Sequence, residues 1–233
     1  MRLSADGSCT DSAPVRYLLF DLDGTLIDTT ELILSCYRAS VSRLVDNPPS
    51  DEDILKGFGT PLRDQLWRLY PALRDRSEEL VAMWLQAYGE LHDRLVKPFP
   101  GTAEVLGELR RRGYPLGVVT SKDRRDAERA MAMFGLDGVV DVLVCVDDTV
   151  RHKPHPEPIL KGLELMAARP RESIYVGDSL SDMKAGREAG LRVAAALWGP
   201  FPKGLLLEFG PDYRLRTIRD LLSLCPSPAS QAV

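Results

Sequence analysis

The stretch Leu18-Leu19-Phe20-Asp21-Leu22-Asp23-Gly24-Thr25-Leu26-Ile27-Asp28-Thr29 decides the fold of this 233-residue chain. It begins as an apolar run of strand length, places two aspartates two residues apart and breaks at a glycine. An apolar strand of this kind is typical of a parallel sheet covered on both faces, and the carboxyl ends of such strands carry the chemistry of the fold. The stretch therefore predicts a buried strand that delivers Asp21 and Asp23 to the rim of a parallel sheet.

Two carboxylates this close repel each other, and one of them takes up a proton unless a cation lies between them. The period of two places Asp21 and Asp23 on one strand face, although Asp23 lies where the strand is already ending. A hard divalent ion prefers oxygen ligands of this kind. The pair therefore indicates a metal site, with Mg²⁺ as the expected ion.

After residue 97 the chain alternates between strand and helix patterns, and this alternation predicts a doubly wound parallel sheet of the Rossmann type, hence the α/β class. A stiff elbow of two prolines and a glycine at 97–101 begins this part of the chain. We expect strands at 116–119, 142–146, 173–176, 191–196 and 213–215, and helices at 102–112, 123–134, 156–168, 181–189 and 217–224.

Residues 30–97 show helical spacing and no strand pattern, which predicts an inserted helical cap domain. We expect helices at 31–45, 62–69 and 77–95, and a short helix that Ser50 caps. Trp67, Trp84 and Tyr88 are interpreted as the core of this cap. The predicted division is a core domain of residues 15–29 and 98–225, a cap of residues 30–97, a disordered extension at 1–14 and a tail at 226–233.

Composition excludes several classes of function. The net charge is −4, from 30 basic and 34 acidic residues that are mixed along the chain, so nucleic acid is not an expected partner. No apolar run reaches the length of a membrane span. The four cysteines are scattered and form no CxxC pair, which favours reduced thiols and a cytoplasmic location. The polar first fourteen residues do not resemble a secretory signal. The expected oligomeric state is a monomer or homodimer.

Polar residues follow four of the predicted strands. In a parallel sheet the carboxyl ends lie along one rim, so groups far apart in the chain can meet in a single crevice. The groups are Asp21 and Asp23 after the first strand, Thr120 and Ser121 after the next, Lys153 in the following loop, and Asp178 with Asp182 one helical turn later.

Each of these residues also has a simpler interpretation. Asp23-Gly24 is a common turn pair, and Thr120, Ser121 or Asp178 could cap a helix. Lys153 alone would most often be a surface lysine. All these alternatives must hold together before the functional interpretation fails.

The same residues form four motifs that resemble the haloacid dehalogenase (HAD) superfamily. The resemblance spans roughly residues 16 to 224, and the helical segment lies where this family has its mobile cap. The matching runs are Asp21-Leu22-Asp23-Gly24-Thr25, Val118-Val119-Thr120, Lys153-Pro154 and Gly177-Asp178-Ser179-Leu180-Ser181-Asp182.

The resemblance implies phosphoryl transfer through an aspartyl-phosphate. Asp21 would be the nucleophile and Asp23 the general acid and base. Mg²⁺ would be held by the Asp21 carboxylate, the Asp23 backbone carbonyl and the Asp178 carboxylate, with Asp182 behind them. Thr120 would bind a phosphoryl oxygen, and Lys153 would neutralise Asp21 and the transferring group.

The predicted substrate-binding residues are Gly24, Ser121, Lys122 and Arg63. Arg63 follows the 57–61 loop of the cap, where related enzymes have residues that select the substrate. It could bind a carboxylate or second phosphate, although an arginine in this position is more often a solvated surface group. Lys122 has similar standing. His152 and His155 are interpreted as loop residues, because carboxylate oxygens suit Mg²⁺ better.

Asp23 also narrows the predicted activity. Dehalogenases and phosphonatases of the superfamily lack an acid at this position, so Asp23 favours a phosphatase or phosphomutase. Residues 20–33 and 146–158 look most like the phosphoglycolate phosphatase group, including its inorganic pyrophosphatase branch. The first hypothesis is thus a small-metabolite phosphatase similar to phosphoglycolate phosphatase. The alternatives are, in order, an inorganic pyrophosphatase, a phosphomutase of the beta-phosphoglucomutase type and a non-catalytic binding protein.

Overall fold

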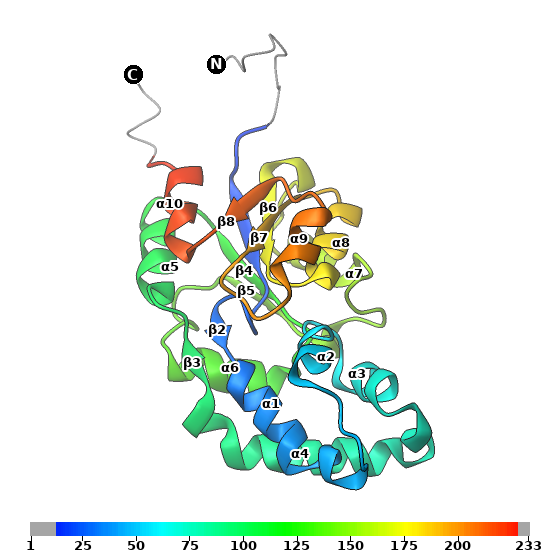
Figure 1. Ribbon diagram of the computed structural model, residues 1–233. Coiled ribbons are helices and arrows are strands. Elements are labelled where there is room, and N and C mark those ends of the chain that lie inside the picture. Colours follow the sequence, from blue (N-terminus) through cyan, green and yellow to red (C-terminus); the bar gives the residue numbers. More distant parts are fainter. Residues whose placement is uncertain (1–12, 228–233) are drawn as a thin grey trace.

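A computed structural model describes residues 13–227, in which one parallel sheet lies at one end and a group of helices at the other (Figure 1). The predictions for residues 1–12 and 228–233, and for Cys9, lie outside the described residues. The sheet has the strand order β5-β4-β1-β6-β7-β8, and every pairing in it is parallel. The predicted α/β class is confirmed.

The strand that carries Asp21 and Asp23 lies in the middle of the sheet. This strand, β1 (Tyr17–Phe20), pairs with β4 (Leu116–Val119) on one side and β6 (Ser173–Gly177) on the other. Its apolar residues Leu18, Leu19 and Phe20 are fully buried, as expected of a strand covered on both faces. The remaining strands are β5 (Val142–Val144), β7 (Arg192–Ala196) and β8 (Tyr213–Leu215).

Helices cover both faces of the sheet and pack through separate apolar clusters. One face carries α7 (Glu157–Leu165) and α8 (Leu180–Glu188), which bury Ile159, Leu163 and Ala185 against strand residues such as Leu19 and Val119. The other face is covered by α5 (Thr102–Arg111), α6 (Arg124–Met133) and α10 (Leu221–Leu224). Beside β7 lies α9 (Lys203–Glu208), in a segment where no helix was expected.

The segment 30–97, which we call the cap, leaves and rejoins the core at adjacent points. The residues at its two junctions with the core pair as an antiparallel two-stranded ladder, in which β2 (Ile27–Asp28) lies against β3 (Lys97–Pro98). This ladder occupies the predicted elbow, where no strand was expected. Between them lie α1 (Thr30–Ala39), α2 (Asp51–Leu55), α3 (Leu62–Leu69) and α4 (Ser77–Leu95), with 3-10 turns at Val41–Leu44 and Pro71–Arg76.

Local chemistry explains where the cap helices begin and end. Ser50 caps α2 as predicted, because its side chain accepts a hydrogen bond from the Asp53 amide. The expected helix at 31–45 is shorter than predicted, because α1 ends when the Ser40 backbone leaves the helical region and the Ser40 hydroxyl bonds the Cys36 carbonyl. None of the described helices is long and apolar enough to cross a membrane.

Aromatic side chains form the centre of the cap. Trp84 stacks on Tyr88 with ring centroids 5.2 Å apart, and both are buried, as the sequence predicted. Tyr37 meets the edge of Trp84. Trp67 differs from the prediction, because it is only half-buried and lies under the Arg74 guanidinium.

The cap loop of residues 57–61 contacts the core directly. Phe58 is 3% exposed and packs in a cluster with Met183, Val193 and Phe201 of the core. Gly59 has a φ of +80°, and a Cβ added there would lie 2.5 Å from the Ser179 hydroxyl. A side chain at this position therefore cannot be accommodated while the cap is docked.

Candidate active site

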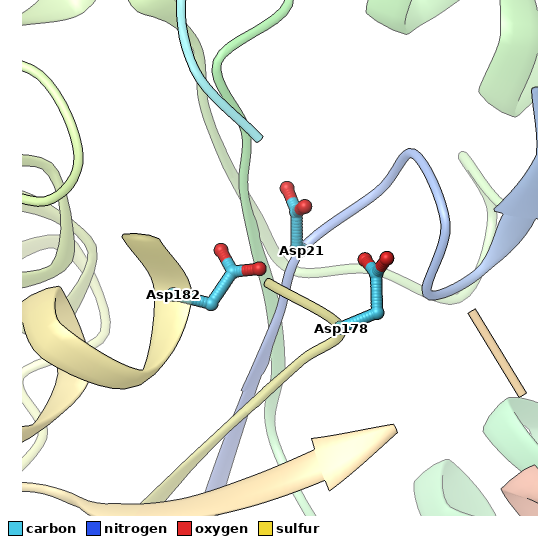
Figure 2. Close-up of side chains that lie close together, drawn as sticks. All are labelled: Asp21, Asp178 and Asp182. Carbon is cyan, nitrogen blue, oxygen red and sulfur yellow. The ribbon is translucent and has the colours of Figure 1, made fainter. Parts of the chain in front are cut away.

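Three buried carboxylates converge at the carboxyl end of the sheet (Figure 2). Asp21 follows β1, Asp178 follows β6 and Asp182 lies in the first turn of α8. One oxygen from each lies within 4.8 Å of the others, and none of the three residues is more than 2% exposed. The sheet rim thus brings together acids that are separated by more than 150 positions in the chain, as the strand-end argument predicted.

Lys153 is the cation of this cluster. Its ammonium nitrogen lies 2.9 Å from Asp21 Oδ1 and 2.6 Å from Asp182 Oδ1, and the residue is 2% exposed. Burial lowers the lysine pKa, but Asp182 and Asp21 outweigh it and hold that pKa well above its usual range. Lys153 is therefore a fixed positive charge beside the predicted nucleophile.

Opposing effects act on the pKa of Asp21. Burial and the nearby Asp182 raise its pKa from 3.8 to about 7, against the lowering effect of Lys153. One lysine thus does not compensate for the crowded carboxylates, and the cluster is short of positive charge.

Tyr175 belongs to the same network, although its sequence context predicts only a strand residue. Its hydroxyl donates to the Val119 carbonyl at 2.8 Å and accepts from the Lys153 ammonium at 3.1 Å. The available signal was a tyrosine among the apolar residues of a central strand, where a buried hydroxyl needs a partner.

Both carboxylate oxygens of Asp182 have partners within the cluster. Its Oδ1 faces Lys153, while its Oδ2 accepts hydrogen bonds from the amide and hydroxyl of Ser179 at 3.0 and 2.6 Å. Ser179 in turn caps α8 through the Asp182 amide, so the two residues form a capping box. Asp182 therefore combines the helix cap with a hold on Lys153.

Asp178 has an unsatisfied oxygen. Thr25 donates to its Oδ1 at 3.1 Å, but Oδ2 is buried without a hydrogen-bond partner. Burial, together with Asp182 and Asp21, raises the Asp178 pKa well above its ordinary value. A buried acceptor of this kind is costly unless something binds it. Glycines allow the close packing here: a Cβ at Gly24, where φ is +83°, would lie 2.5 Å from this oxygen.

The donor set fits a hard divalent cation. It is made of carboxylate oxygens, one of them without a partner, and the raised pKa values of Asp21 and Asp178 mark a deficit of positive charge. Asp21 and Asp178 are the residues that would hold the ion, whereas the oxygens of Asp182 are already taken. Mg²⁺ itself stays a prediction.

The Asp23 carboxylate forms a salt bridge with Lys122. The lysine nitrogen lies 2.8 Å from both carboxylate oxygens of Asp23 and 5.1 Å from the centre of the Tyr88 ring. Asp23 is not one of the three acids whose oxygens lie within 4.8 Å of one another, and its expected role as a ligand through the backbone carbonyl stays a prediction.

Comparison with known proteins settles the family. A model of the family described as haloacid dehalogenase-like hydrolase matches residues 18–196. The chain is a haloacid dehalogenase-like hydrolase. The family resemblance drawn from the four motifs is therefore confirmed.

Relatives of this hydrolase carry two kinds of name. It is 37% identical over 210 residues to pyrophosphatase PpaX of Bacillus mycoides, covering 90% of this chain and 96% of that one, and PpaX of Halalkalibacterium halodurans is equally similar. Its fold matches the crystal structure of a "putative phosphoglycolate phosphatase" from Lactobacillus plantarum, with a TM-score of 0.82 and 25% identity over 91% of this chain and all of that one. The chain is thus similar to enzymes named for hydrolysis of phosphate compounds.

A cavity of about 200 Å³ separates the carboxylates of the hydrolase from its cap. Asp21, Asp23, Thr120, Ser121 and Lys122 line its core side. Its cap side is largely apolar and is formed by Ile33, Phe58, Pro61, Leu62, Trp84, Leu85 and Tyr88, among others.

The hydrolase positions the two hydroxyl residues differently. The Thr120 hydroxyl lies at this cavity and accepts a hydrogen bond from the Lys122 amide at 3.2 Å. Ser121 instead donates to the carbonyl of Gly59 at 2.9 Å and so ties the core to the cap loop. Their assignments to phosphoryl and substrate binding stay predictions.

Arg63 does not line the cavity. Its guanidinium forms two hydrogen bonds, of 2.6 and 3.1 Å, with the Glu78 carboxylate on the cap surface. This arrangement matches the solvated surface alternative for Arg63 and gives no support to its predicted role in substrate binding. The physical reason is that Glu78, one helical segment later, satisfies the planar fork of the arginine.

Proposed function

We propose that this hydrolase is a Mg²⁺-dependent phosphatase that cleaves a small phosphorylated metabolite through an aspartyl-phosphate. One observation carries the proposal: Asp21, Lys153 and Asp178 meet at the sheet rim, and Asp21 lines a cavity between the core and the cap. The nucleophile, its counter-charge and an unsatisfied metal-binding oxygen are the parts that phosphoryl transfer requires.

Asp21 is the proposed nucleophile. Lys153 holds it through Oδ1, and the other carboxylate oxygen would attack phosphorus. The lysine then neutralises both the carboxylate and the arriving phosphate, which otherwise repel each other. Thr120 lines the cavity, and its hydroxyl would bind a phosphoryl oxygen.

Asp21, Asp178 and the backbone carbonyl of Asp23 are the proposed ligands of Mg²⁺. When bound, the ion supplies the positive charge that these acids lack and stabilises the negative charge of the transferring group. Tyr175 and Asp182 hydrogen-bond the Lys153 ammonium at 3.1 and 2.6 Å and so hold it beside Asp21.

Asp23 is the proposed general acid and base. It would protonate the oxygen of the leaving group and later take a proton from the water that attacks the phosphoenzyme. Its carboxylate is 16% exposed and lines the cavity, so a leaving group there can reach it.

Phosphoglycolate and pyrophosphate are the proposed substrates to compare first. Phosphoglycolate comes from the resemblance of the sequence, and pyrophosphate is favoured by the name of the PpaX relatives. We further propose that the protein acts in the cytoplasm, without nucleic acid or membrane, as a monomer or homodimer.

Phosphate release in the presence of Mg²⁺, measured on a panel of phosphate esters and pyrophosphate, tests the proposal. We expect turnover that chelation with EDTA stops and that Asp21→Asn abolishes, while the exposed surface change Asp137→Asn leaves it intact. Unchanged turnover in Asp21→Asn would contradict the assignment of the nucleophile. Isomerisation of beta-glucose 1-phosphate without phosphate release would instead favour a phosphomutase.

A further inference from the structure

The cavity beside Asp21 has very little positive charge to offer a substrate. Lys122 is the one lysine, arginine or histidine among the described residues that line it, because Arg63 lies elsewhere and Lys153 lies behind Asp21. Asp123 and Asp126 also line the cavity and would repel an anion. Any negative charge on the leaving group must therefore be met at Lys122.

Lys122 stands next to the bond that would break. Its nitrogen is 2.8 Å from both carboxylate oxygens of Asp23, and its side chain is 8% exposed. A general acid lies about 2.6 to 3.2 Å from the oxygen that it protonates. Adding that distance to the 2.8 Å of the salt bridge puts the lysine nitrogen within about 6 Å of the oxygen that bridges phosphorus and the leaving group.

The position of Lys122 limits where a second anionic group can lie on the substrate. An anionic oxygen two bonds from the bridging oxygen, as in pyrophosphate, or three bonds away, as in phosphoglycolate, can contact the lysine nitrogen. Each methylene inserted between them lets the anion lie farther from the bridging oxygen and so from Lys122, and the apolar lining residues, such as Leu62, Trp84 and Leu85, offer it no charge. A charged group placed against such a wall loses its hydration without gaining a partner.

We propose that Lys122 determines substrate specificity and that it selects compact substrates in which a second anionic oxygen lies two or three bonds from the bridging oxygen. Lys122 binds this anion while it stays beside Asp23. The inference rests on the proposed phosphatase function and names the class of substrate for that site.

A chain-length series in the wild-type enzyme tests the proposal. The substrates are phosphoglycolate, its homologues with one and two further methylenes between the ester oxygen and carboxylate, ethyl phosphate as the analogue without a carboxylate, and pyrophosphate. We expect kcat/KM for phosphoglycolate to exceed that for ethyl phosphate by about 10- to 100-fold, as for a hydrogen bond between charged groups. The value should fall with each added methylene.

Variants of Lys122 provide the second measurement. Lys122→Met should bring kcat/KM for phosphoglycolate and ethyl phosphate close together, and Lys122→Arg should restore part of the difference. Arg63→Met is the matched control, because it removes a cap cation that does not line the cavity, and it should leave the ratio unchanged. The ratio of kcat/KM for phosphoglycolate to kcat/KM for ethyl phosphate reports specificity. A general loss of activity, caused by removing the salt-bridge partner of Asp23, would lower both values and leave this ratio unchanged.

Two results would overturn the inference while leaving the phosphatase intact. One is equal hydrolysis of ethyl phosphate and phosphoglycolate by the wild type, a comparison that does not depend on whether any variant folds. The other is a ratio that Lys122→Met leaves unchanged or that Arg63→Met removes. Absence of Mg²⁺-dependent phosphate release from every substrate would instead refute the proposed function, and this inference with it.

Discussion

Replacement of Asp178 by asparagine should separate metal binding from fold stability. The buried Oδ2 of Asp178 has no partner, and burial together with Asp182 and Asp21 raises its pKa, so its charge destabilises the metal-free protein. Asparagine keeps an oxygen that can accept the hydrogen bond from Thr25 but carries no charge. We therefore expect Asp178→Asn to melt at the same temperature as the wild type or higher when EDTA is present.

The wild type should respond strongly to Mg²⁺, whereas Asp178→Asn should not. A ligand that binds only the folded state at 100 times its dissociation constant adds about 2.7 kcal/mol of stability. For a chain of this length 1 kcal/mol raises Tm by about 2 to 4 °C, so the expected rise is about 5 to 11 °C. Thermal unfolding across a Mg²⁺ titration measures it, with the surface variant Asp137→Asn as control. Equal Mg²⁺-induced shifts in wild type and Asp178→Asn would refute the assignment of this carboxylate as a ligand.

Three further perturbations follow from the same geometry. The pKa of Asp21 is raised from 3.8 to about 7, so the metal-free folded state binds more protons than the unfolded state. The free energy of unfolding should therefore fall by at most about 4 kcal/mol as pH rises from about 4 through 7. Urea unfolding in EDTA measures this change, and a free energy of unfolding that rises over the same pH range would contradict the pKa shift. Gly199→Ala puts a Cβ in contact with Asp178 and 2.6 Å from the Gly24 carbonyl, so the Mg²⁺ affinity measured by calorimetry should drop. An unchanged affinity would contradict this expectation and would show that the backbone around residue 199 moves to make room for the methyl group. Phe58→Ala removes about 3 to 5 kcal/mol of packing between cap and core. KM should therefore rise, and loop 57–61 should become sensitive to protease. A variant whose loop stays as resistant to protease as the wild type would contradict this expectation.

The sheet and its rim were predictable because each central strand is a continuous apolar run that ends in polar residues. Such runs are buried on both faces, and parallel strands place their carboxyl ends at one edge. The sequence therefore predicts that Asp21, Lys153 and Asp178 lie close together. In the structure, Lys153 contacts Asp21, and the carboxylates of Asp21 and Asp178 lie within 4.8 Å of each other. The α9 helix was missed because its apolar pattern is short and follows a run of prolines and glycine.

Side-chain partners were harder to predict than positions in the fold. The sequence gives no sign that Lys122 would turn to Asp23 or that Arg63 would turn to Glu78, because both pairings depend on how the cap packs. Tyr175 was overlooked because an aromatic residue in a buried strand usually indicates packing alone. In each case the outcome depends on contacts between elements distant in the chain, which residue type and spacing do not encode locally.

The short ladder between Ile27–Asp28 and Lys97–Pro98 has a consequence for how enzymes of this design diversify. The two junctions of the cap are paired with each other where the chain leaves the sheet, so a change in the length of the inserted segment need not alter the register of the strands of the sheet. The proposed catalytic acids belong to the core, whereas much of the apolar wall of the cavity belongs to the cap. A new specificity can thus arise by replacing sixty-odd residues at a single entry point, with the reactive machinery inherited unaltered.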